Sequence, residues 1–262
     1  MSVSSNVTPL LVASGLSKSY DGRMACEDIS LSIREGEVLA IVGESGSGKS
    51  TLLNMLAGRL DADLGQVHYR MRDGITRDMR ALSEAERRVL MRTDWGFVHQ
   101  DAAQGLRMNV SAGGNIGERL MAIGNRHYGD IRATAAHWLT RVEINTDRID
   151  DKPTAYSGGM RQRLQIARNL VTAPRLVFMD EPTGGLDVSV QARLLDLIRG
   201  LAADLGLAVI LVTHDLAVAR LLSHRIMVMK GGHVIETGLT DRVLDDPQAA
   251  YTQLLVSSVL AA

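Results

Sequence analysis

The chain of 262 residues has little of what marks several other classes of protein. Its one cysteine, Cys26, excludes an intramolecular disulfide and a cysteine-ligated metal or iron-sulfur site, and is typical of a reducing cytoplasm. Lys and Arg number 29 against 30 Asp and Glu, so the basic surplus typical of nucleic-acid-binding domains is missing. We therefore expect a cytoplasmic protein that binds no nucleic acid.

Long apolar runs are missing as well. Runs such as 207–212 have the length of a strand, whereas a membrane-spanning helix needs about 18 consecutive apolar residues. No basic stretch precedes an apolar segment near the N-terminus, as it would in a secretory signal. The sequence predicts neither export nor direct insertion into a membrane.

What is present is the pattern of an α/β fold. Ile29, Leu31 and Ile33 alternate with polar residues, which predicts a half-buried strand in an N-terminal antiparallel β subdomain. Continuous apolar runs, typical of buried parallel strands, occur at 38–42, 176–179 and 208–212. The residues between the first two runs have mainly helical spacing. We predict one domain over 1–262, with a core of 1–100 and 173–262 and an inserted helical subdomain of about 101–172.

A phosphate-binding motif follows the first apolar run. Residues 43–50 fit the pattern G-x-x-x-x-G-K-[ST] and lie between a predicted strand and a predicted helix. The glycines let backbone N–H groups approach phosphate oxygens, Lys49 reaches the outer phosphates, and the Ser50 hydroxyl can bind Mg²⁺. The predicted nucleotide contacts are Gly43, Glu44, Ser45, Gly46, Ser47, Gly48, Lys49, Ser50 and Thr51.

Two acidic residues end the second apolar run. Asp180 and Glu181 follow four apolar residues at 176–179, where a phosphate-binding loop needs an acid that holds Mg²⁺. Asp180 is predicted to bind the metal and Glu181 to polarise the attacking water. The alternative is a pair of solvated acids at the end of a strand.

These motifs resemble those of the ATP-binding cassette (ABC) ATPases, in the same order along the chain. Ser157, Gly158 and Gly159 are similar to the signature motif of that family. Its most common form is Leu-Ser-Gly-Gly-Gln, so Tyr156 and Met160 are departures. The resemblance implies a P-loop NTPase of ABC type with a RecA-like mixed-sheet core, and a helical subdomain that carries the signature.

Other single residues match the family too. Gln100 resembles the Q-loop glutamine, Asp187 the D-loop aspartate and His214 the switch histidine, although His214 could instead be a buried structural histidine. Tyr20 lies where the family stacks an aromatic side chain on adenine. Only nine residues are aromatic, 2 Phe, 2 Trp and 5 Tyr, so this placement is informative; the alternative is a tyrosine packed at the end of a strand.

The resemblance assigns roles to these residues. It implies an ATPase with ATP and Mg²⁺ as ligands, in which ATP on one copy is completed by residues 157–159 and Asp187 of a second copy placed head to tail. The implied catalytic residues are Lys49, Gln100, Glu181 and His214, and the implied metal ligands are Ser50, Gln100 and Asp180.

Two branches of the family compete for the chain's role. Residues 181–191 and the C-terminal tail resemble ATPases of oligopeptide and nickel importers. Residues 92–100, 105–121, 128–134, 148–151 and 251–260 resemble the ATPase subunit of the carbon-phosphorus lyase machinery, which degrades phosphonates. After the Q-loop, where the family contacts the protein it drives, Leu106-Arg107-Met108 replaces the Leu-Asn-Pro of importers, unless this variation is unrelated to partners.

The second resemblance implies a non-transporting homodimer that docks on the carbon-phosphorus lyase core complex, with another ABC ATPase as a further candidate partner. Importer ATPase and nucleotide-dependent assembly factor remain the alternatives. The cassette would not break the carbon-phosphorus bond itself, because that radical chemistry needs an iron-sulfur cluster and one cysteine cannot hold it.

Overall fold

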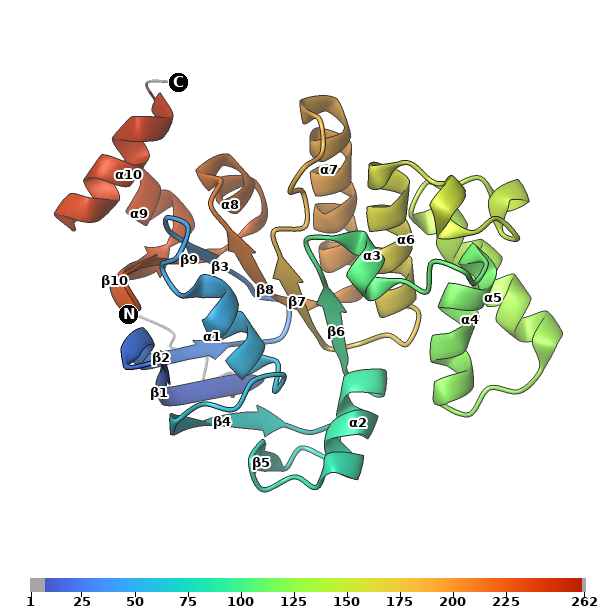
Figure 1. The fold of residues 1–262 in the computed structure, drawn as a ribbon, viewed down its shortest axis with the longest axis horizontal. Helices are drawn as coiled ribbons and strands as arrows, with labels where there is room; N and C mark the ends of the chain where they lie inside the picture. Colours follow the sequence, from blue (N-terminus) through green and yellow to red (C-terminus); the bar gives the residue numbers. More distant parts are fainter. Residues whose placement is uncertain (1–7, 261–262) are drawn as a thin grey trace, which may run out of the picture. The chain divides into compact units, whose positions relative to one another are not determined.

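A computed structural model describes residues 8–260 and divides into two units by the contacts between residues (Figure 1). Within the described range, the first unit holds residues 8–87 and 208–260, and the second holds 88–207. These limits differ from the predicted helical subdomain of 101–172, because the second unit also includes a pair of strands and the long helix that follows residue 187. Among residues 8–260, no helix has both the length and the apolar content needed to cross a bilayer.

The first unit contains an antiparallel sheet, as the alternation at 29–33 predicts. Its strand order is β2-β1-β4-β5, and Leu11 pairs with Ile33 across β1 and β2. The strands are β1 (Leu11–Tyr20), β2 (Arg23–Ile33), β4 (Leu64–Arg70) and β5 (Thr76–Asp78). Asp21 and Gly22 join β1 to β2 with φ of 48° and 77°, positive values that suit a two-residue hairpin turn.

Buried parallel strands form the other sheet of this unit. Strand β3 lies between β8 and β9, parallel to both, and β10 pairs antiparallel with β9. Every residue of β3 and β8 is buried, as their continuous apolar sequences predict. The strands are β3 (Val38–Val42), β8 (Ala208–Thr213), β9 (Arg225–Lys230) and β10 (His233–Leu239). The helices of this unit are α1 (Lys49–Leu56), α8 (Leu216–Leu222), α9 (Thr240–Asp245) and α10 (Ala250–Leu260).

The C-terminal helices cover β3 and β9. Ala40 and Val42 of β3 and Val228 of β9 form one buried cluster with side chains of α8, α9 and α10, and these helices lie together beside the two strands (Figure 1). The start of α10 is tied to β10, since the carboxylate of Glu236 accepts from the backbone N–H of Gln248 (2.9 Å) and of Ala249 (3.0 Å). The C-terminal helix therefore has a defined position on the first unit.

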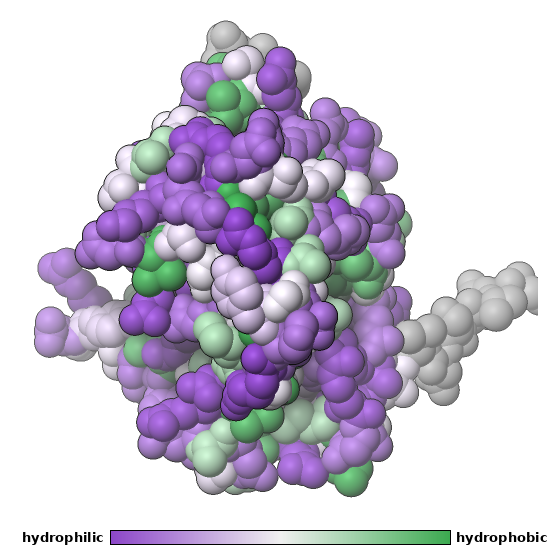
Figure 2. Space-filling model, turned by 90° about the vertical axis from the view of Figure 1, so that its right-hand side faces the viewer, coloured by the Kyte–Doolittle hydropathy of each residue, from purple (hydrophilic) through white to green (hydrophobic). Residues whose placement is uncertain are grey.

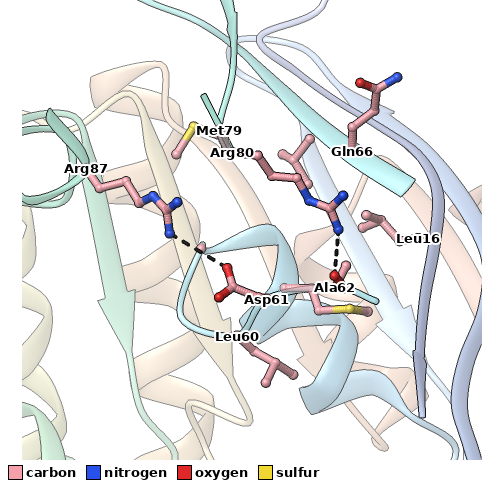
Figure 3. A pocket seen from close by; sticks show the side chains of 11 residues that line it. Leu16, Leu60, Asp61, Ala62, Gln66, Met79, Arg80 and Arg87 are labelled. Carbon is pink, nitrogen blue, oxygen red and sulfur yellow. Dashed lines mark hydrogen bonds and ion pairs between the residues drawn. The ribbon is translucent and has the colours of Figure 1, made fainter. Parts of the chain in front are cut away.

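A small cavity lies at the end of α1 and the loop that follows it, in the same unit (Figure 3). Its volume is about 30 Å³, which is room for a single water molecule. Two arginines line it: Arg80 donates to the carbonyl of Ala62, and an Arg87 nitrogen lies 3.7 Å from the carboxylate of Asp61 (Figure 3). Their contacts tie the loop after α1 to the segment after β5.

The second unit combines two parallel strands with most of the helices. Strands β6 (Trp95–Val98) and β7 (Leu176–Asp180) pair with each other, and Trp95, Phe97 and Phe178 pack between them. The helices are α3 (Ala102–Gly105), α4 (Ala112–Ala122), α5 (Tyr128–Arg141), α6 (Gly158–Leu170) and α7 (Val188–Leu205), with short 3₁₀ turns at Thr146–Arg148 and Pro153–Ala155.

Helix α2 (Glu84–Thr93) crosses from the first unit to the second. It begins with a capping box, in which Ser83 N–H donates to the Glu86 carboxylate (2.8 Å) and Glu86 N–H donates to Ser83 Oγ (3.3 Å).

Candidate functional site

The loop between β3 and α1 is built around the side chain of Lys49. Lys49 is buried, and its Nζ donates to the carbonyls of Gly43 (2.8 Å) and Glu44 (2.7 Å). The loop therefore folds back over its own lysine and holds one positive charge at its centre. The backbone N–H groups in the first turn of α1 point toward the N-terminal end of the helix, which is the end that joins this loop. Convergent N–H groups and one ammonium are a donor set for phosphate.

Glycine is required at two points of this loop. Gly43 has φ 149°, and a Cβ there would lie 2.1 Å from the carbonyl oxygen of Met229. Gly48, the N-cap of α1, has φ 99°, and its Cβ would lie 2.1 Å from the carbonyl oxygen of Ala25. The loop is thus pressed against β9 on one side and β2 on the other, with no space for a side chain.

The hairpin of β1 and β2 contributes Tyr20 and Cys26. The Tyr20 side chain is 47% exposed and Lys18 Nζ lies 5.8 Å from its ring centroid, so Tyr20 is not packed into the end of the strand. Cys26 is buried, and its Sγ donates to the Gly48 carbonyl (3.4 Å). Burial raises the pKa of the Cys26 thiol to about 12, which leaves it an unreactive packing residue.

His214 follows β8, in the same unit as the phosphate-binding loop. It is exposed rather than buried, so the alternative interpretation as a buried structural histidine is wrong. The next residue, Asp215, caps α8 by accepting from the N–H groups of Ala217 and Val218. This cap fixes the turn on which His214 lies.

In the second unit, the acidic end of β7 lies beside the Q-loop. Asp180 is the last residue of β7, and Gln100 Nε2 donates to Glu181 Oε2 over 3.2 Å. Glu181 has φ 42°, a left-handed conformation that is unusual for a residue other than glycine, and its carbonyl accepts from Gly184 N–H. Strained backbone of this kind is concentrated at functional sites.

The signature residues begin helix α6. Ser157 is the N-cap and its Oγ accepts from Met160 N–H (3.3 Å). Ser157 and Gly158 are exposed, whereas a Cβ on Gly159 would lie 2.5 Å from a Val190 side-chain carbon. An exposed serine at an exposed helix N-terminus is suited to bind an anionic group on a second molecule.

The two departures from the common signature share one partner. Tyr156 is buried, its hydroxyl donates to the Arg148 carbonyl (2.8 Å), and the Arg148 guanidinium lies 4.7 Å from its ring centroid. The same guanidinium donates to the Met160 sulfur over 3.5 Å. Tyr156 and Met160 thus both contact Arg148. Arg148 is the last residue of the adjoining 3₁₀ turn, and it contacts the residue before and the residue after the signature sequence 157–159.

Asp187 begins helix α7. Its carboxylate accepts from Val190 N–H (3.0 Å) and from the Ser189 hydroxyl (2.8 Å). The hydrogen bonds from Val190 N–H and then from Ser189 lower its pKa, so the cap is ionised at neutral pH. Val188, the next residue, is 85% exposed.

Three side-chain amides of α6 were not found by sequence reasoning. Gln165 Oε1 accepts from His99 N–H (2.7 Å), and Gln162 Nε2 and Gln165 Nε2 both donate to the His99 carbonyl (3.0 and 3.1 Å). Asn169 exchanges two further hydrogen bonds with the backbone of Phe97. We call Gln162, Gln165 and Asn169 the amide ladder. Their side chains hydrogen-bond the backbone of β6 at Phe97 and of His99, the residue before Gln100. The sequence pattern that could have indicated this ladder is a set of polar residues at positions i, i+3 and i+7 on a helical face that is otherwise apolar and buried.

Each unit thus carries a part of the predicted site. The phosphate-binding loop, Tyr20 and His214 belong to the first unit, and Gln100, Asp180, Glu181, Asp187 and residues 157–159 belong to the second. The structure brings Gln100 and Glu181 into direct contact within one unit.

Comparison with known proteins gives the family. The ABC transporter family model matches residues 26–184, which is more than half of the chain. The chain is an ABC ATPase. It is 65% identical, over 96% of its own length and 98% of the relative's, to "Putative phosphonates utilization ATP-binding protein PhnK" of Escherichia coli strain K12. It is 35% identical to the oligopeptide transport ATP-binding protein OppF of Salmonella typhimurium, over 90% of the chain and 69% of OppF.

Solved cassettes have the same fold. A dimeric post-hydrolysis state of the ATP-binding cassette MJ0796, bound to ADP and Pi, matches this ABC ATPase with a TM-score of 0.78 and 30% identity, over 88% of the chain and 98% of that structure. CbiO1 of Clostridium perfringens matches with the same TM-score, 30% identity and 91% coverage of both chains. The predicted P-loop fold of ABC type is confirmed, and the chain is an ATP-hydrolysing cassette.

Proposed function

We propose that this cassette is the ATP-hydrolysing subunit that works with the carbon-phosphorus lyase core complex in the use of organic phosphonates, in the cytoplasm. The observation that carries the proposal is the 65% identity, over almost the whole length of both chains, to a protein named for phosphonate utilization. The segments that resemble the lyase ATPase include the partner-facing residues 105–121, where Leu106-Arg107-Met108 replaces the importer sequence.

ATP would be held by the residues of the phosphate-binding loop, 43–51. The buried Lys49 ammonium and the glycine turns pressed against Ala25 and Met229 fit a triphosphate, because backbone N–H groups and one cation are what its oxygens require. Tyr20 would stack on the adenine, since its ring is half exposed. Ser50, Gln100 and Asp180 are oxygen ligands of the kind Mg²⁺ prefers; the ion would neutralise charge on the phosphates.

Glu181 is the proposed general base for the attacking water. Its carboxylate is oriented by the hydrogen bond from Gln100 and by the left-handed backbone at residue 181. A base oriented in this way accepts a proton from water as the water oxygen attacks phosphorus. His214, exposed after β8, would orient the same phosphoryl group, and Lys49 would stabilise its negative charge.

The second copy would complete the site. The exposed Ser157-Gly158 turn and the helix N-terminus of α6 form an anion-binding surface that belongs to the opposite copy's ATP in a head-to-tail dimer, with Asp187 alongside. Support comes from the dimeric cassettes among the structural matches. ATP binding would close the dimer and hydrolysis would reopen it.

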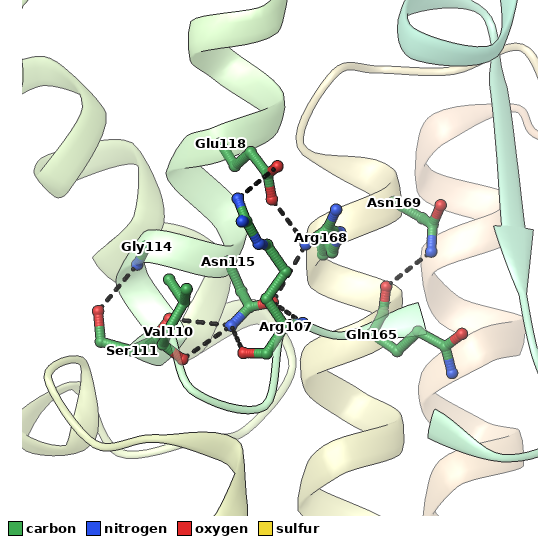
Figure 4. A network of polar contacts seen from close by, with 9 residues as sticks. All are labelled: Arg107, Val110, Ser111, Gly114, Asn115, Glu118, Gln165, Arg168 and Asn169. Atoms are coloured by element: carbon green, nitrogen blue, oxygen red, sulfur yellow. Dashed lines mark hydrogen bonds and ion pairs between the residues drawn. The ribbon is translucent and has the colours of Figure 1, made fainter. Parts of the chain in front are cut away.

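The proposed contact with the lyase core is the segment after the Q-loop (Figure 4). Asn115 fixes this segment: its Oδ1 accepts from Arg107 N–H (2.8 Å) and its Nδ2 donates to the carbonyls of Arg107, Val110 and Ser111 (3.0–3.1 Å). The Arg107 side chain is 62% exposed and pairs with Glu118, which also pairs with Arg168 (Figure 4). A rigid loop that presents an arginine favours an acidic partner surface.

The face that carries α4 and α5 agrees with polar recognition. Hydrophilic side chains cover most of it, and apolar side chains appear as small separate patches (Figure 2). Partners that dock on such a face would be selected mainly by charge and hydrogen bonds. Another ABC ATPase is a further candidate partner in the assembly.

A second candidate function is that of an importer ATPase, favoured by the 35% identity to OppF over 90% of the chain. Co-purification separates the two. We expect the tagged cassette, isolated from cells grown on a phosphonate, to recover soluble lyase subunits. Recovery of integral membrane permeases in their place would overturn the proposal.

Glu181→Gln tests whether turnover is needed, as opposed to ATP-dependent assembly alone. The variant should bind ATP, accumulate as a closed dimer on size-exclusion chromatography and hydrolyse ATP at least a hundredfold more slowly, because the base is lost. Glu143→Gln, which neutralises an exposed carboxylate paired with Arg163, is the matched control. Growth of the Glu181→Gln strain on phosphonate as the sole phosphorus source would show that the cassette acts as an assembly factor.

A further inference from the structure

One side chain of the C-terminal helix touches the phosphate-binding loop. The backbone N–H of Glu44 donates to the hydroxyl of Tyr251 over 3.3 Å, across 207 residues of sequence. The peptide group that contains this N–H also contains the Gly43 carbonyl, which accepts from Lys49 Nζ over 2.8 Å. A peptide group is planar, so its N–H and C=O turn together. The Tyr251 hydroxyl therefore fixes the direction of the carbonyl that holds the lysine.

Tyr251 is itself held on several sides. It is only 9% exposed and packs in the cluster that contains Ala40 and Val42 of β3. Lys230 Nζ lies 4.5 Å from the centroid of its ring, over the end of β9. A tyrosine restrained in this way can serve as a fixed reference for a loop.

The helix that carries Tyr251 is also anchored at its start. The Glu236 carboxylate receives the N–H groups of Gln248 and Ala249, directly before α10. A continuous set of contacts thus runs from β10 through Glu236 to α10, and from Tyr251 to the Gly43–Glu44 peptide group. Residues 43–50, which define the loop motif, contain no indication of this support from the C-terminal helix.

We propose that Tyr251 is a positioning residue for ATP: its hydroxyl orients the Gly43–Glu44 peptide group, and through it Lys49, so that α10 controls the affinity of the loop for phosphate. The inference rests on the proposed phosphate-binding role of Lys49. It assigns Tyr251 no contact with ATP. The hydroxyl acts on a loop amide and the ring acts on the core, so the two contributions can be separated by mutation.

Tyr251→Phe removes the hydroxyl and retains the ring. We expect the ATP dissociation constant, measured by calorimetry on the full chain, to rise about fivefold, as the loss of one hydrogen bond implies. Hydrogen exchange at the Glu44 amide, followed by mass spectrometry without nucleotide, should become faster because its acceptor is gone. Tyr69→Phe, which removes a fully buried hydroxyl from β4 of the same unit, should change neither quantity.

Each remaining outcome contradicts the inference. Unchanged ATP affinity of Tyr251→Phe would mean that the hydroxyl does not position the loop for ATP, whether or not exchange at Glu44 is faster. Equal weakening by Tyr69→Phe would indicate general destabilisation. Lys49→Ala, measured in parallel, distinguishes the two levels: if it binds ATP as the unmodified chain does, the phosphate-site proposal fails together with the inference. If Lys49→Ala loses ATP while Tyr251→Phe binds normally, the inference alone fails.

Discussion

At the scale of single residues, the phosphate-binding loop depends on glycines, because a Cβ atom at these positions would collide with neighbouring backbone. Gly48 has a positive φ and faces the Ala25 carbonyl at a distance that no Cβ tolerates. Gly36 also has a positive φ (70°), but nothing lies within 4 Å of the position its Cβ would take. Substitutions at Gly36 and Gly48 therefore separate two effects on stability: the free energy cost of a positive φ, which both sites have, and that of a steric clash, which only Gly48 has.

Gly48→Ala should therefore be much more harmful than Gly36→Ala. The positive φ alone costs about 1 kcal/mol of unfolding free energy at either site. At Gly48 the clash with Ala25 must also displace the loop, so we expect ATP affinity to fall at least tenfold. Chemical denaturation and ATP titration of both variants measure the two effects. Equal behaviour of the two variants would mean that the loop can move away from β2 at little cost.

Tyr20 gives a second test at this scale. Tyr20→Ala should weaken ATP binding about fivefold, since an aromatic stacking contact contributes about 1 kcal/mol. Tyr20→Phe should bind ATP almost normally, because stacking needs the ring and not the hydroxyl. The measurement is the ATP dissociation constant of each variant. Equal losses would indicate a role for the hydroxyl.

At the scale of elements, helix α6 joins two motifs that are far apart in sequence. It begins after the signature serine, and its amide ladder hydrogen-bonds the backbone of His99, which follows β6 and precedes Gln100. Gly105 lies against the same ladder, because a Cβ there would be 2.1 Å from Gln165 Oε1. The side chain of Gln165 thus positions both the Q-loop and the turn that follows it.

Gln165→Ala should lower both stability and turnover. Without its side chain, the N–H of His99 loses its acceptor, which costs about 1–3 kcal/mol of unfolding free energy for a buried group. Because Gln100 is the next residue, we also expect kcat for ATP to fall severalfold. Denaturation and steady-state ATPase assays check this. Gln104→Ala, at an exposed position on α3, is the control; normal kcat in Gln165→Ala would limit the ladder to a structural role.

At the scale of the whole molecule, carboxylates stabilise the fold at neutral pH. Several have a pKa below the ordinary value because they accept hydrogen bonds, and at Asp63 the hydrogen bond from Lys18 is the main cause that lowers the pKa to about 2. At Glu236 burial opposes ionisation, but the hydrogen bonds from Gln248 N–H, from the Thr252 side chain and from Ala249 N–H together lower its pKa. Glu86, Asp150 and Asp187 also have a lowered pKa.

The chain should accordingly lose stability in acid. A carboxyl whose pKa is lower in the folded state contributes stability above its unfolded pKa, and this contribution is lost as pH falls through the folded pKa. We expect the lowered carboxyl pKa values to leave the unfolding free energy unaffected between about pH 5 and pH 8 and to make it decrease from about pH 4 to pH 2. Asp63→Asn should flatten the lower end of this profile. Chemical denaturation at a series of pH values measures the unfolding free energy. If its pH dependence is the same in Asp63→Asn, groups other than Asp63 cause the loss of stability in acid.

The sequence predicts features whose signal is local. The loop at 43–51, the acids after 176–179 and the buried strands are each contained in a short segment, and the structure has the strands where expected. The roles of Tyr251, Gln165 and Arg148 escaped prediction because each contacts a group elsewhere in the sequence: Tyr251 the N–H of Glu44, Gln165 the N–H of His99, and Arg148 the sulfur of Met160. Such contacts depend on tertiary packing, and the spacing of residues along the sequence does not predict them.

The position of Cys26 has a practical consequence for experiments on assembly. The thiol is buried and its pKa is raised to about 12, so almost no thiolate exists at neutral pH. A cysteine introduced at an exposed position, such as Val188→Cys beside the proposed dimer face, would then be the one thiol that reacts with a maleimide probe. One spectroscopic label on each copy, with the native cysteine left in place, would report the distance between the two copies through the ATP cycle.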